Sequence, residues 1–188
     1  MNSPCSIEVY VDSRFLAAPT VELVGERGDH DAPTYFEYDI DYAVTALHAR
    51  DHRAVSVRYP VSFDRVARAP AFPAFLMDLM PQGEARRQVV GRLRAEGRPT
   101  RDWDVLLAGA RNPVGNLRVA AAVTPSEESG RGVELADIVQ RGDDFRAWAE
   151  SQRIPMTGSS DTGGASPKLL MTADANGRFH ADGALPDA

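Results

Sequence analysis

Alternating hydrophobic and polar residues dominate the first sixty positions of the chain. Ile7, Val9 and Val11 alternate with Glu and Tyr residues, which predicts a half-buried strand. The same alternation predicts three further strands, at residues 15–24, 34–40 and 54–61. Pro19 is expected to break the second strand, and the polar residues 26–33 are expected to form a turn or loop. These positions predict a small twisted sheet or a partial barrel.

Beyond residue 70 the apolar residues recur at helical spacing. Residues 74–80 fit a short helix that stops before Pro81, and residues 84–94 fit an amphipathic helix. A third helix is expected at residues 102–110, with Thr100 as its N-cap. The side chains expected to point inward from these last two helices are Ala85, Val89, Val90, Leu93, Trp103, Leu106 and Leu107. Later elements are expected as a strand at 117–123 and short helices at 135–140 and 143–151.

The C-terminal third begins with a polar stretch, residues 124–132, which we expect to be a linker or an exposed loop. Residues 168–173 predict a strand, Asn176 and Gly177 predict a tight turn, and residues 178–182 predict a returning strand. The whole pattern predicts an α+β fold, with a small N-terminal sheet and helices followed by a hairpin. We divide the chain into residues 1–123, a linker with short helices at 124–157, and residues 158–188.

The charge of the chain argues against one class of function. A formal net charge of −6 over 188 residues disfavours non-specific nucleic-acid binding, which needs a basic surface. One stretch is locally basic, and its arginines are Arg86, Arg87, Arg92, Arg94, Arg98 and Arg101. Counter-charges at Glu84, Glu96 and Asp102 favour a solvated helix face, and a partner or nucleic-acid contact is the alternative.

The cysteine content and the hydropathy suggest a cytoplasmic protein. Cys5 is the single cysteine, so it cannot form an internal disulfide, and we interpret it as an incidental thiol. No run of about 18 apolar residues is present, and no secretory signal pattern is seen at the N-terminus. We therefore expect no contact with a membrane.

Three pairs of polar residues could suggest metal or acid–base chemistry, but each has a simpler interpretation. His48 and His52 have the spacing of a metal pair on a helix, but no third ligand stands at motif spacing. Asp39 and Asp41 lie at the expected end of a strand. The adjacent residues 143 and 144, both Asp, are typical of a helix N-terminus. We therefore predict no metal site and no catalytic residue.

Residues 158–168 carry the most informative pattern in the chain. They read Gly-Ser-Ser-Asp-Thr-Gly-Gly-Ala-Ser-Pro-Lys, and paired glycines with hydroxyls and a lysine suit a phosphate cradle. A P-loop NTPase is excluded, because Pro167 precedes Lys168 and the following residues predict a strand instead of a helix. The arrangement is closer to the glycine-rich loop of a kinase. The alternative is an ordinary glycine turn.

Two further segments occur with this loop. Residues 75–86 read Phe-Leu-Met-Asp-Leu-Met-Pro-Gln-Gly-Glu-Ala-Arg, and a Trp-Asp-Val-Leu-Leu run at 103–107 precedes Pro-Val-Gly-Asn-Leu at 113–117. Together with Gly-Gly-Ala-Ser-Pro-Lys at 163–168, they resemble, in order, signatures of the HipA-type toxin kinases. The chain departs mildly at Met80 and Gln82, and Ser166 replaces the usual Arg or Gln.

The resemblance implies a function and a set of site residues. It makes residues 1–123 a HipA-like N-terminal subdomain and 158–188 the start of a kinase-like core with the first hairpin of its N-lobe. In a complete kinase, the backbone of Gly163, Gly164, Ala165 and Ser166, with Lys168 nearby, would contact the phosphates of ATP with Mg²⁺. No nucleotide is expected to bind to these 188 residues alone, because the core that completes the cleft is expected beyond Ala188. Asp161 lies where family members often carry an autophosphorylated serine, so Ser159 or Ser160 is the possible site here. The expected partners are a helix-turn-helix antitoxin or a kinase core.

Two main hypotheses and one generic alternative follow. The first is an N-terminal fragment of a HipA-like serine/threonine kinase that is inactive alone, since no His-Arg-Asp or Asp-Phe-Gly element occurs in the sequence. Its catalytic residues are then expected beyond Ala188. The second is a non-catalytic module that binds and restrains a separate HipA-type kinase. A small ligand-binding α+β domain is the generic alternative.

Overall fold

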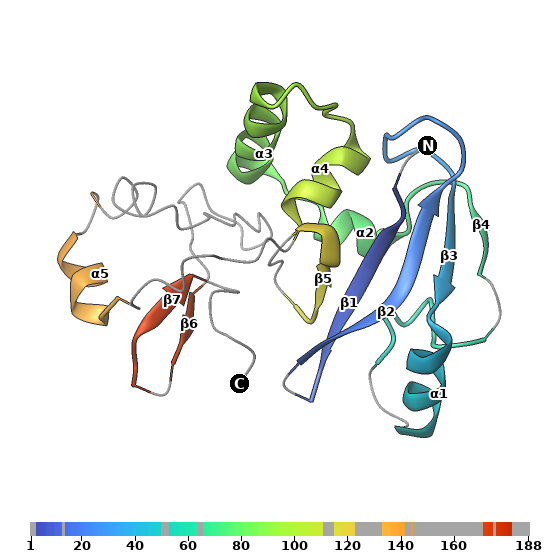
Figure 1. Ribbon diagram of the computed structural model, residues 1–188, viewed down its shortest axis with the longest axis horizontal. Helices are drawn as coiled ribbons and strands as arrows, with labels where there is room; N and C mark the ends of the chain where they lie inside the picture. Colours follow the sequence, from blue (N-terminus) through green and yellow to red (C-terminus); the bar gives the residue numbers. More distant parts are fainter. Residues whose placement is uncertain are drawn as a thin grey trace.

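The computed structural model describes residues 3–12, 14–49, 53–63, 66–110, 115–122, 133–141, 144, 171–174 and 176–181. Within them, an antiparallel sheet of five strands has the order β4-β3-β2-β1-β5 (Figure 1). The strands are β1 (Cys5–Val11), β2 (Arg14–Leu23), β3 (Thr34–Tyr38), β4 (Val66–Ala69) and β5 (Leu117–Val119). The sheet has two edge strands and is therefore open. The predicted α+β class is confirmed.

The first two strands show why a proline need not end a strand. Cys5, Ile7 and Val9 of β1 are fully buried, as their alternation predicted. The register with β2 shifts between Ser6 and Glu8, which is the mark of a β-bulge opposite Ile7. Pro19 lies in this bulge and pairs with β3, so the expectation that it breaks the strand is wrong. A bulge tolerates proline because the ladder is already interrupted there.

Strand β3 ends earlier than predicted because the next residue starts a helix. The Oδ1 atom of Asp39 accepts a hydrogen bond of 2.9 Å from the backbone N–H of Tyr42. This contact is an N-cap, and α1 (Ile40–Ala49) follows it. Asp39 and Asp41 therefore lie at the start of a helix and not at the end of a strand.

The strand predicted at residues 54–61 is also wrong. The backbone N–H of Tyr59 donates to the carbonyl of Ser56 at 3.0 Å, which folds this segment into a tight turn with one isolated bridge. Val57 lies at the turn and is fully exposed, although its position in the alternation suggested burial. The buried Tyr38 holds the segment, since its hydroxyl donates to the carbonyl of Tyr59 and accepts from the N–H of Val55. The strand that pairs with the outer side of β3 is instead β4, which forms one edge of the sheet.

Four helices and the sheet enclose one hydrophobic core. The helices predicted after residue 70 are confirmed as α2 (Ala74–Leu79), α3 (Gly83–Ala95) and α4 (Asp102–Gly109). Figure 1 places them together at the β5 side of the sheet, with α1 at the opposite end beside β3. Trp103 is 1% exposed and meets Phe72 edge to face, with ring centroids 5.6 Å apart. The strand predicted at 117–123 is shorter, because the 3₁₀ helix η1 (Ala120–Ala122) follows β5.

A smaller set of elements follows in the last third of the chain. Helix α5 (Leu135–Arg141) confirms the helix predicted at 135–140, and β6 (Met171–Ala173) pairs with β7 (Phe179–Ala181) as predicted. Gly177 has φ +76°, and Asp174 accepts hydrogen bonds across the turn from the N–H groups of residues 176 and 178. A hydrogen bond from His180 lowers the pKa of Asp174. The assignment of this hairpin to a kinase N-lobe stays a prediction.

Several predicted segments fall wholly or mostly outside the described residues. They are the linker at 124–132, the helix at 143–151 and the first half of the strand at 168–173. Among the helices that the structure does describe, none has the length and apolar character needed to cross a bilayer.

Candidate functional site

The residues predicted to hold a nucleotide lie outside the described part of the chain. This is true of Gly163, Gly164, Ala165, Ser166 and Lys168, and also of the possible phosphorylation sites Ser159 and Ser160. His52 of the possible metal pair is likewise outside it. Among the described residues, no group of three or more His, Cys, Asp or Glu side chains could hold a metal ion. The structure therefore leaves the predicted phosphate loop as a prediction.

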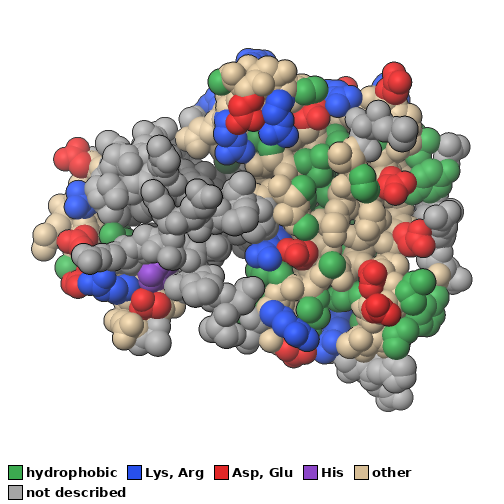
Figure 2. Space-filling view, in the orientation of Figure 1, with side chains coloured by type: hydrophobic (Ala, Val, Ile, Leu, Met, Phe, Trp, Pro, Cys, Tyr) green, Lys and Arg blue, Asp and Glu red, His purple; other side chains and the backbone are tan. Residues whose placement is uncertain are grey.

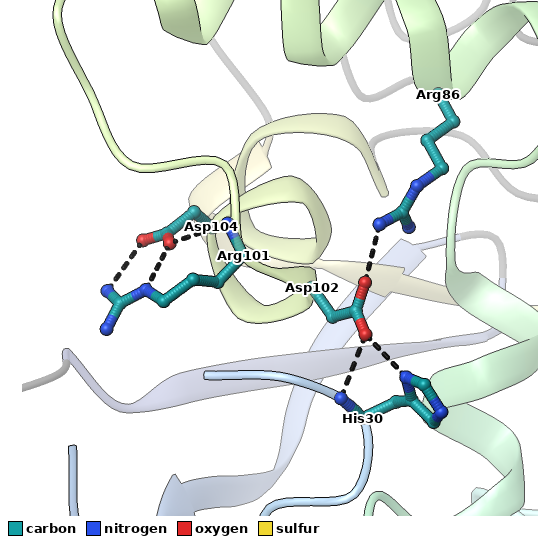
Figure 3. Close-up of polar contacts among 5 residues, drawn as sticks. All are labelled: His30, Arg86, Arg101, Asp102 and Asp104. Atoms are coloured by element: carbon teal, nitrogen blue, oxygen red, sulfur yellow. Dashed lines mark hydrogen bonds and ion pairs between the residues drawn. The ribbon is translucent and has the colours of Figure 1, made fainter. Parts of the chain in front are cut away.

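A polar site that joins three elements is centred on Asp102, at the first turn of α4 (Figure 3). Its Oδ2 atom accepts two hydrogen bonds from His30, one from the backbone N–H at 2.9 Å and one involving Nδ1 at 2.7 Å. Its Oδ1 atom accepts a bond of 2.5 Å from the guanidinium of Arg86 on α3. We call His30, Arg86 and Asp102 the Asp102 cluster. It joins the loop after β2 to two helices.

Local contacts bring the loop of residues 24–33 up to α4. The backbone N–H of Trp103 donates to the carbonyl of Gly28 at 2.7 Å. A Cβ atom on Gly28 would lie only 3.0 Å from the Cδ and Nε atoms of Arg101, so a glycine allows this close approach. The Arg101 guanidinium in turn donates to the carbonyl of Glu26 at 3.0 Å. The loop is thus held at several points along its length.

The start of α4 differs from the predicted cap. Arg101, and not Thr100, is the N-cap residue. The carboxylate of Asp104 accepts from the Arg101 backbone N–H at 3.2 Å, which is the reciprocal half of a capping box. The same carboxylate also pairs with the Arg101 side chain, at 2.7 Å from Nε. The acidic residue in the first turn thus accepts from the N-cap backbone N–H, which is a different contact from the one expected of a threonine side chain.

The electrostatics of the cluster follow from partial burial. The side chain of Asp102 is 13% exposed, whereas that of Arg86 is 36% exposed and that of His30 is 63% exposed. Burial of the Asp102 carboxylate opposes its ionisation, but the hydrogen bonds from Arg86 and His30 outweigh burial, and the pKa of Asp102 is lowered. Asp102 is therefore a carboxylate at neutral pH.

A His–Asp pair can also orient a histidine for catalysis. Such a site needs a nucleophile beside the imidazole. Among the described residues, no serine, threonine or cysteine side chain forms a hydrogen bond with His30. The arrangement supports a structural role for the Asp102 cluster.

The segment 75–86 has a clear structural role in the same region. Pro81 is buried, and a Cβ atom on Gly109 would lie 2.6 Å from its Cγ atom, so the end of α4 packs tightly on the turn between α2 and α3. Gly83 has φ +52°, a conformation that favours glycine. Arg86 then reaches Asp102. Pro81, Gly83 and Arg86 therefore hold α2, α3 and α4 together.

The arginine-rich stretch is also partly explained. Two of the three expected counter-charges, Asp102 and Glu96, pair with Arg86 and Arg98 at 2.5 and 3.1 Å. Arg92 donates to the carbonyl of Ala108 at 2.8 Å. These contacts agree with a solvated helix face.

Sequence reasoning did not single out His30. It stands 72 residues before Asp102 in an ordinary polar loop, and no local pattern marks it. Its partner Asp102 was noted only as a counter-charge for the arginines. The pairing is visible only once the fold brings the loop and α4 together.

Comparison with known proteins agrees with the architecture described above. No curated protein and no solved structure gives a significant match to the chain. A family model described as the HipA N-terminal domain matches residues 21–120. This span is more than half of the chain, and it runs from β2 to η1 through the Asp102 cluster and the fastened helices. The chain therefore belongs to the HipA N-terminal domain family.

Proposed function

We propose that this chain acts as the N-terminal region of a HipA-like serine/threonine kinase, the toxin of a toxin–antitoxin pair. The observation that carries the proposal is the family match over residues 21–120. The glycine-rich segment 158–168 supports it, since a loop of this composition follows the matched domain in the same chain. The antitoxin in this proposal is a helix-turn-helix protein.

The elements next to the glycine-rich segment suit a phosphate-binding lid. In kinases the glycine-rich loop covers the nucleotide phosphates between two strands. Here β6 begins at Met171, three positions after Lys168, and in the proposal it is the strand that follows the loop. The residues that would form the strand before the loop lie outside the described part of the chain. In the proposal, Gly163 and Gly164 offer backbone N–H groups to the phosphates of MgATP, and Lys168 supplies a positive charge. Phosphorylation of Ser159 or Ser160 would add negative charge beside this loop and weaken nucleotide binding.

The proposal assigns phosphate transfer to a kinase core and not to these 188 residues alone. Transfer needs a catalytic aspartate and metal-binding Asp and Asn residues in their sequence context. The printed sequence contains neither a His-Arg-Asp nor an Asp-Phe-Gly element. We therefore expect neither nucleotide binding nor turnover when the chain is tested by itself, and nucleotide binding only once a kinase core completes the cleft.

Fluorescence anisotropy with a fluorescent ATP analogue and Mg²⁺, measured on the chain joined to a HipA-type kinase core, tests this proposal. Saturable binding is expected for the wild type, with binding at least about tenfold weaker for Lys168→Ala. Arg141→Ala, on α5, is the matched control and is expected to bind like the wild type. Equal binding by Lys168→Ala, or none by the wild type, would contradict a phosphate-loop role. Stoichiometric self-labelling of the chain alone with [γ-³²P]ATP would contradict the absence of turnover.

A second candidate function is a non-catalytic module that binds and restrains a separate HipA-type kinase. The described five-stranded domain favours it in one respect, because its described residues form one continuous hydrophobic core. Calorimetric titration of the chain with a HipA-type kinase core tests this candidate. Binding that survives Lys168→Ala, together with inhibition of the kinase, would favour the second function over the first.

A further inference from the structure

Helix α1 has two apolar faces, and only one of them packs into the core. Tyr42, Ala43 and Ala46 are buried, and α1 contacts β2. The ring of Tyr42 stacks on Tyr38 of β3, with centroids 6.1 Å apart and an interplanar angle of 4°. A helix that packs on a sheet needs one apolar stripe, about 100° wide. The buried residues of α1 form this stripe, so packing on the core explains the apolar residues on one side of α1.

The second apolar face lies beside the first and is exposed. Ile40, Val44 and Leu47 are 68%, 43% and 45% exposed. Their spacing of four and three residues places them on one side of the helix, in a row about 10 Å long. We call these three residues the α1 face.

This alignment distinguishes the α1 face from other exposed apolar residues. Single exposed hydrophobic residues are ordinary, and Val57 at the tip of its turn is an example. A row of three large aliphatic side chains on one helix is a surface that another molecule can cover. Figure 2 shows hydrophobic side chains at the end of the molecule where Figure 1 places α1, with acidic side chains beside them.

The charges around the α1 face indicate the chemistry of its partner. Asp39 and Asp41 flank Ile40, Glu37 precedes them on β3, and all three residues are exposed. Helix α1 itself contains no lysine or arginine. The surface is therefore apolar along its length and acidic at its N-terminal end. A complementary partner is apolar along one side and basic at the end that meets Asp41.

An antiparallel helix satisfies both requirements. Its C-terminal turn would lie beside the N-terminal turn of α1, where the two helix dipoles oppose each other favourably. Lysine and arginine are already favoured in the last turn of a helix by its own dipole. Apolar residues at spacings of three and four along such a helix would cover Ile40, Val44 and Leu47.

We propose that the α1 face binds an amphipathic helix of another protein, oriented antiparallel to α1 and carrying basic residues in its last turn. The binding requires neither a nucleotide nor the glycine-rich segment. It therefore goes beyond the proposed kinase function, and the two proposals can fail separately.

A synthetic helix serves as the probe. The peptide has about 20 residues, so that a stable helix can form, with leucines on one side, lysines in the last turn and a fluorescent label. A charge-reversed peptide carries glutamates in place of the lysines. Binding to the full chain is followed by anisotropy, with the fold of each variant checked by circular dichroism.

Five results are expected. The basic peptide binds saturably to the wild type, the double variant Ile40→Gln/Leu47→Gln binds about tenfold more weakly, and Asp41→Asn reduces both the affinity and its salt dependence. The charge-reversed peptide binds more weakly than the basic one. The matched control Val57→Gln, which changes an exposed residue outside the α1 face, leaves affinity unchanged.

Three results would overturn the proposal. They are no saturable binding up to about 1 mM peptide, equal affinity for the double variant, and equal affinity for the charge-reversed peptide. Sedimentation of the chain alone tests whether a second copy of the chain covers the α1 face instead. A dimer that the double variant abolishes would assign the α1 face to a second copy of this chain and would also refute a helix of another protein. Binding of the ATP analogue, measured on the chain joined to a HipA-type kinase core, is expected to be the same in all of these variants.

Discussion

Removal of the Asp102 carboxylate is the most informative perturbation of the described domain. Asp102→Ala deletes the acceptor of three hydrogen bonds, two from His30 and one from Arg86. A hydrogen bond to a charged group contributes about 1.5–3 kcal/mol, but the exposed parts of Arg86 and His30 can recover water as a partner. We therefore expect the free energy of unfolding to fall by about 2 kcal/mol, less than the sum of three bonds.

Urea unfolding followed by tryptophan fluorescence measures this change. The midpoint is expected to fall without a change in the slope m, since the variant exposes no additional surface on unfolding. Asp78→Ala is the matched control, because this aspartate lies exposed on the neighbouring α2. The control is expected to change stability by less than about 0.5 kcal/mol. Equal effects of the two substitutions would refute a stabilising Asp102 cluster.

The pH dependence of the same difference has a definite sign. The pKa of Asp102 is lower in the folded protein than its ordinary value, so the unfolded chain binds the proton more readily. The stabilisation by Asp102 is therefore complete above about pH 4–5 and is lost as the pH falls through the lowered folded pKa. The stability difference between wild type and Asp102→Ala should shrink in that acidic range. A constant difference from pH 7 to the acid transition would contradict the lowered pKa.

Three further predictions concern the core. Gly109→Ala should destabilise the domain by about 1–3 kcal/mol in urea unfolding, because its Cβ would lie 2.6 Å from a proline carbon. Gly91→Ala should instead stabilise the domain by about 0.5–1 kcal/mol, because a Cβ there has open space in a helix. A Gly109→Ala variant more stable than Gly91→Ala would refute the packing described for α4. Tyr38→Phe should cost about 1–3 kcal/mol by leaving two backbone groups unpaired, while Tyr10→Phe, on an exposed ring, should cost less than about 0.5 kcal/mol. Burial raises the pKa of the Cys5 thiol to about 12, so a thiol reagent at pH 8 should label it only after unfolding, and rapid labelling of the native chain would show that β1 is not buried as described.

The elements predicted correctly are those whose pattern agrees with their burial. Cys5, Ile7 and Val9 alternate and are buried, and the helices after residue 70 present their apolar sides to the core. The alternating pattern gave wrong predictions where a polar contact determines the local backbone structure. Residues 34–40 alternate like one strand, but the cap by Asp39 turns the chain into α1. At residues 54–61, hydrogen bonds to Ser56 and Tyr38 form a turn in place of a strand.

The site was predictable only in part, for a physical reason. The segment 75–86 is one of three whose joint occurrence indicated the family, and the structure shows that its Pro81, Gly83 and Arg86 hold neighbouring helices together. Packing constraints of this kind leave local patterns that a sequence reveals. The contact between His30 and Asp102 leaves no such pattern, since it spans 72 residues and depends on the completed fold. The chemistry predicted for residues 158–168 stays a prediction, because these residues lie outside the described part of the chain.

Nuclear magnetic resonance of the ¹⁵N-labelled chain, joined to a HipA-type kinase core and titrated with MgATP, tests the central claim most directly. The account predicts the largest saturable shifts at the backbone N–H groups of Gly163, Gly164, Ala165 and Ser166, with little change at His30 in the Asp102 cluster. It predicts that Lys168→Ala weakens these shifts at every nucleotide concentration. Saturable shifts centred on the five-stranded domain, or none at the paired glycines, would contradict a nucleotide phosphate loop in this member of the HipA N-terminal domain family.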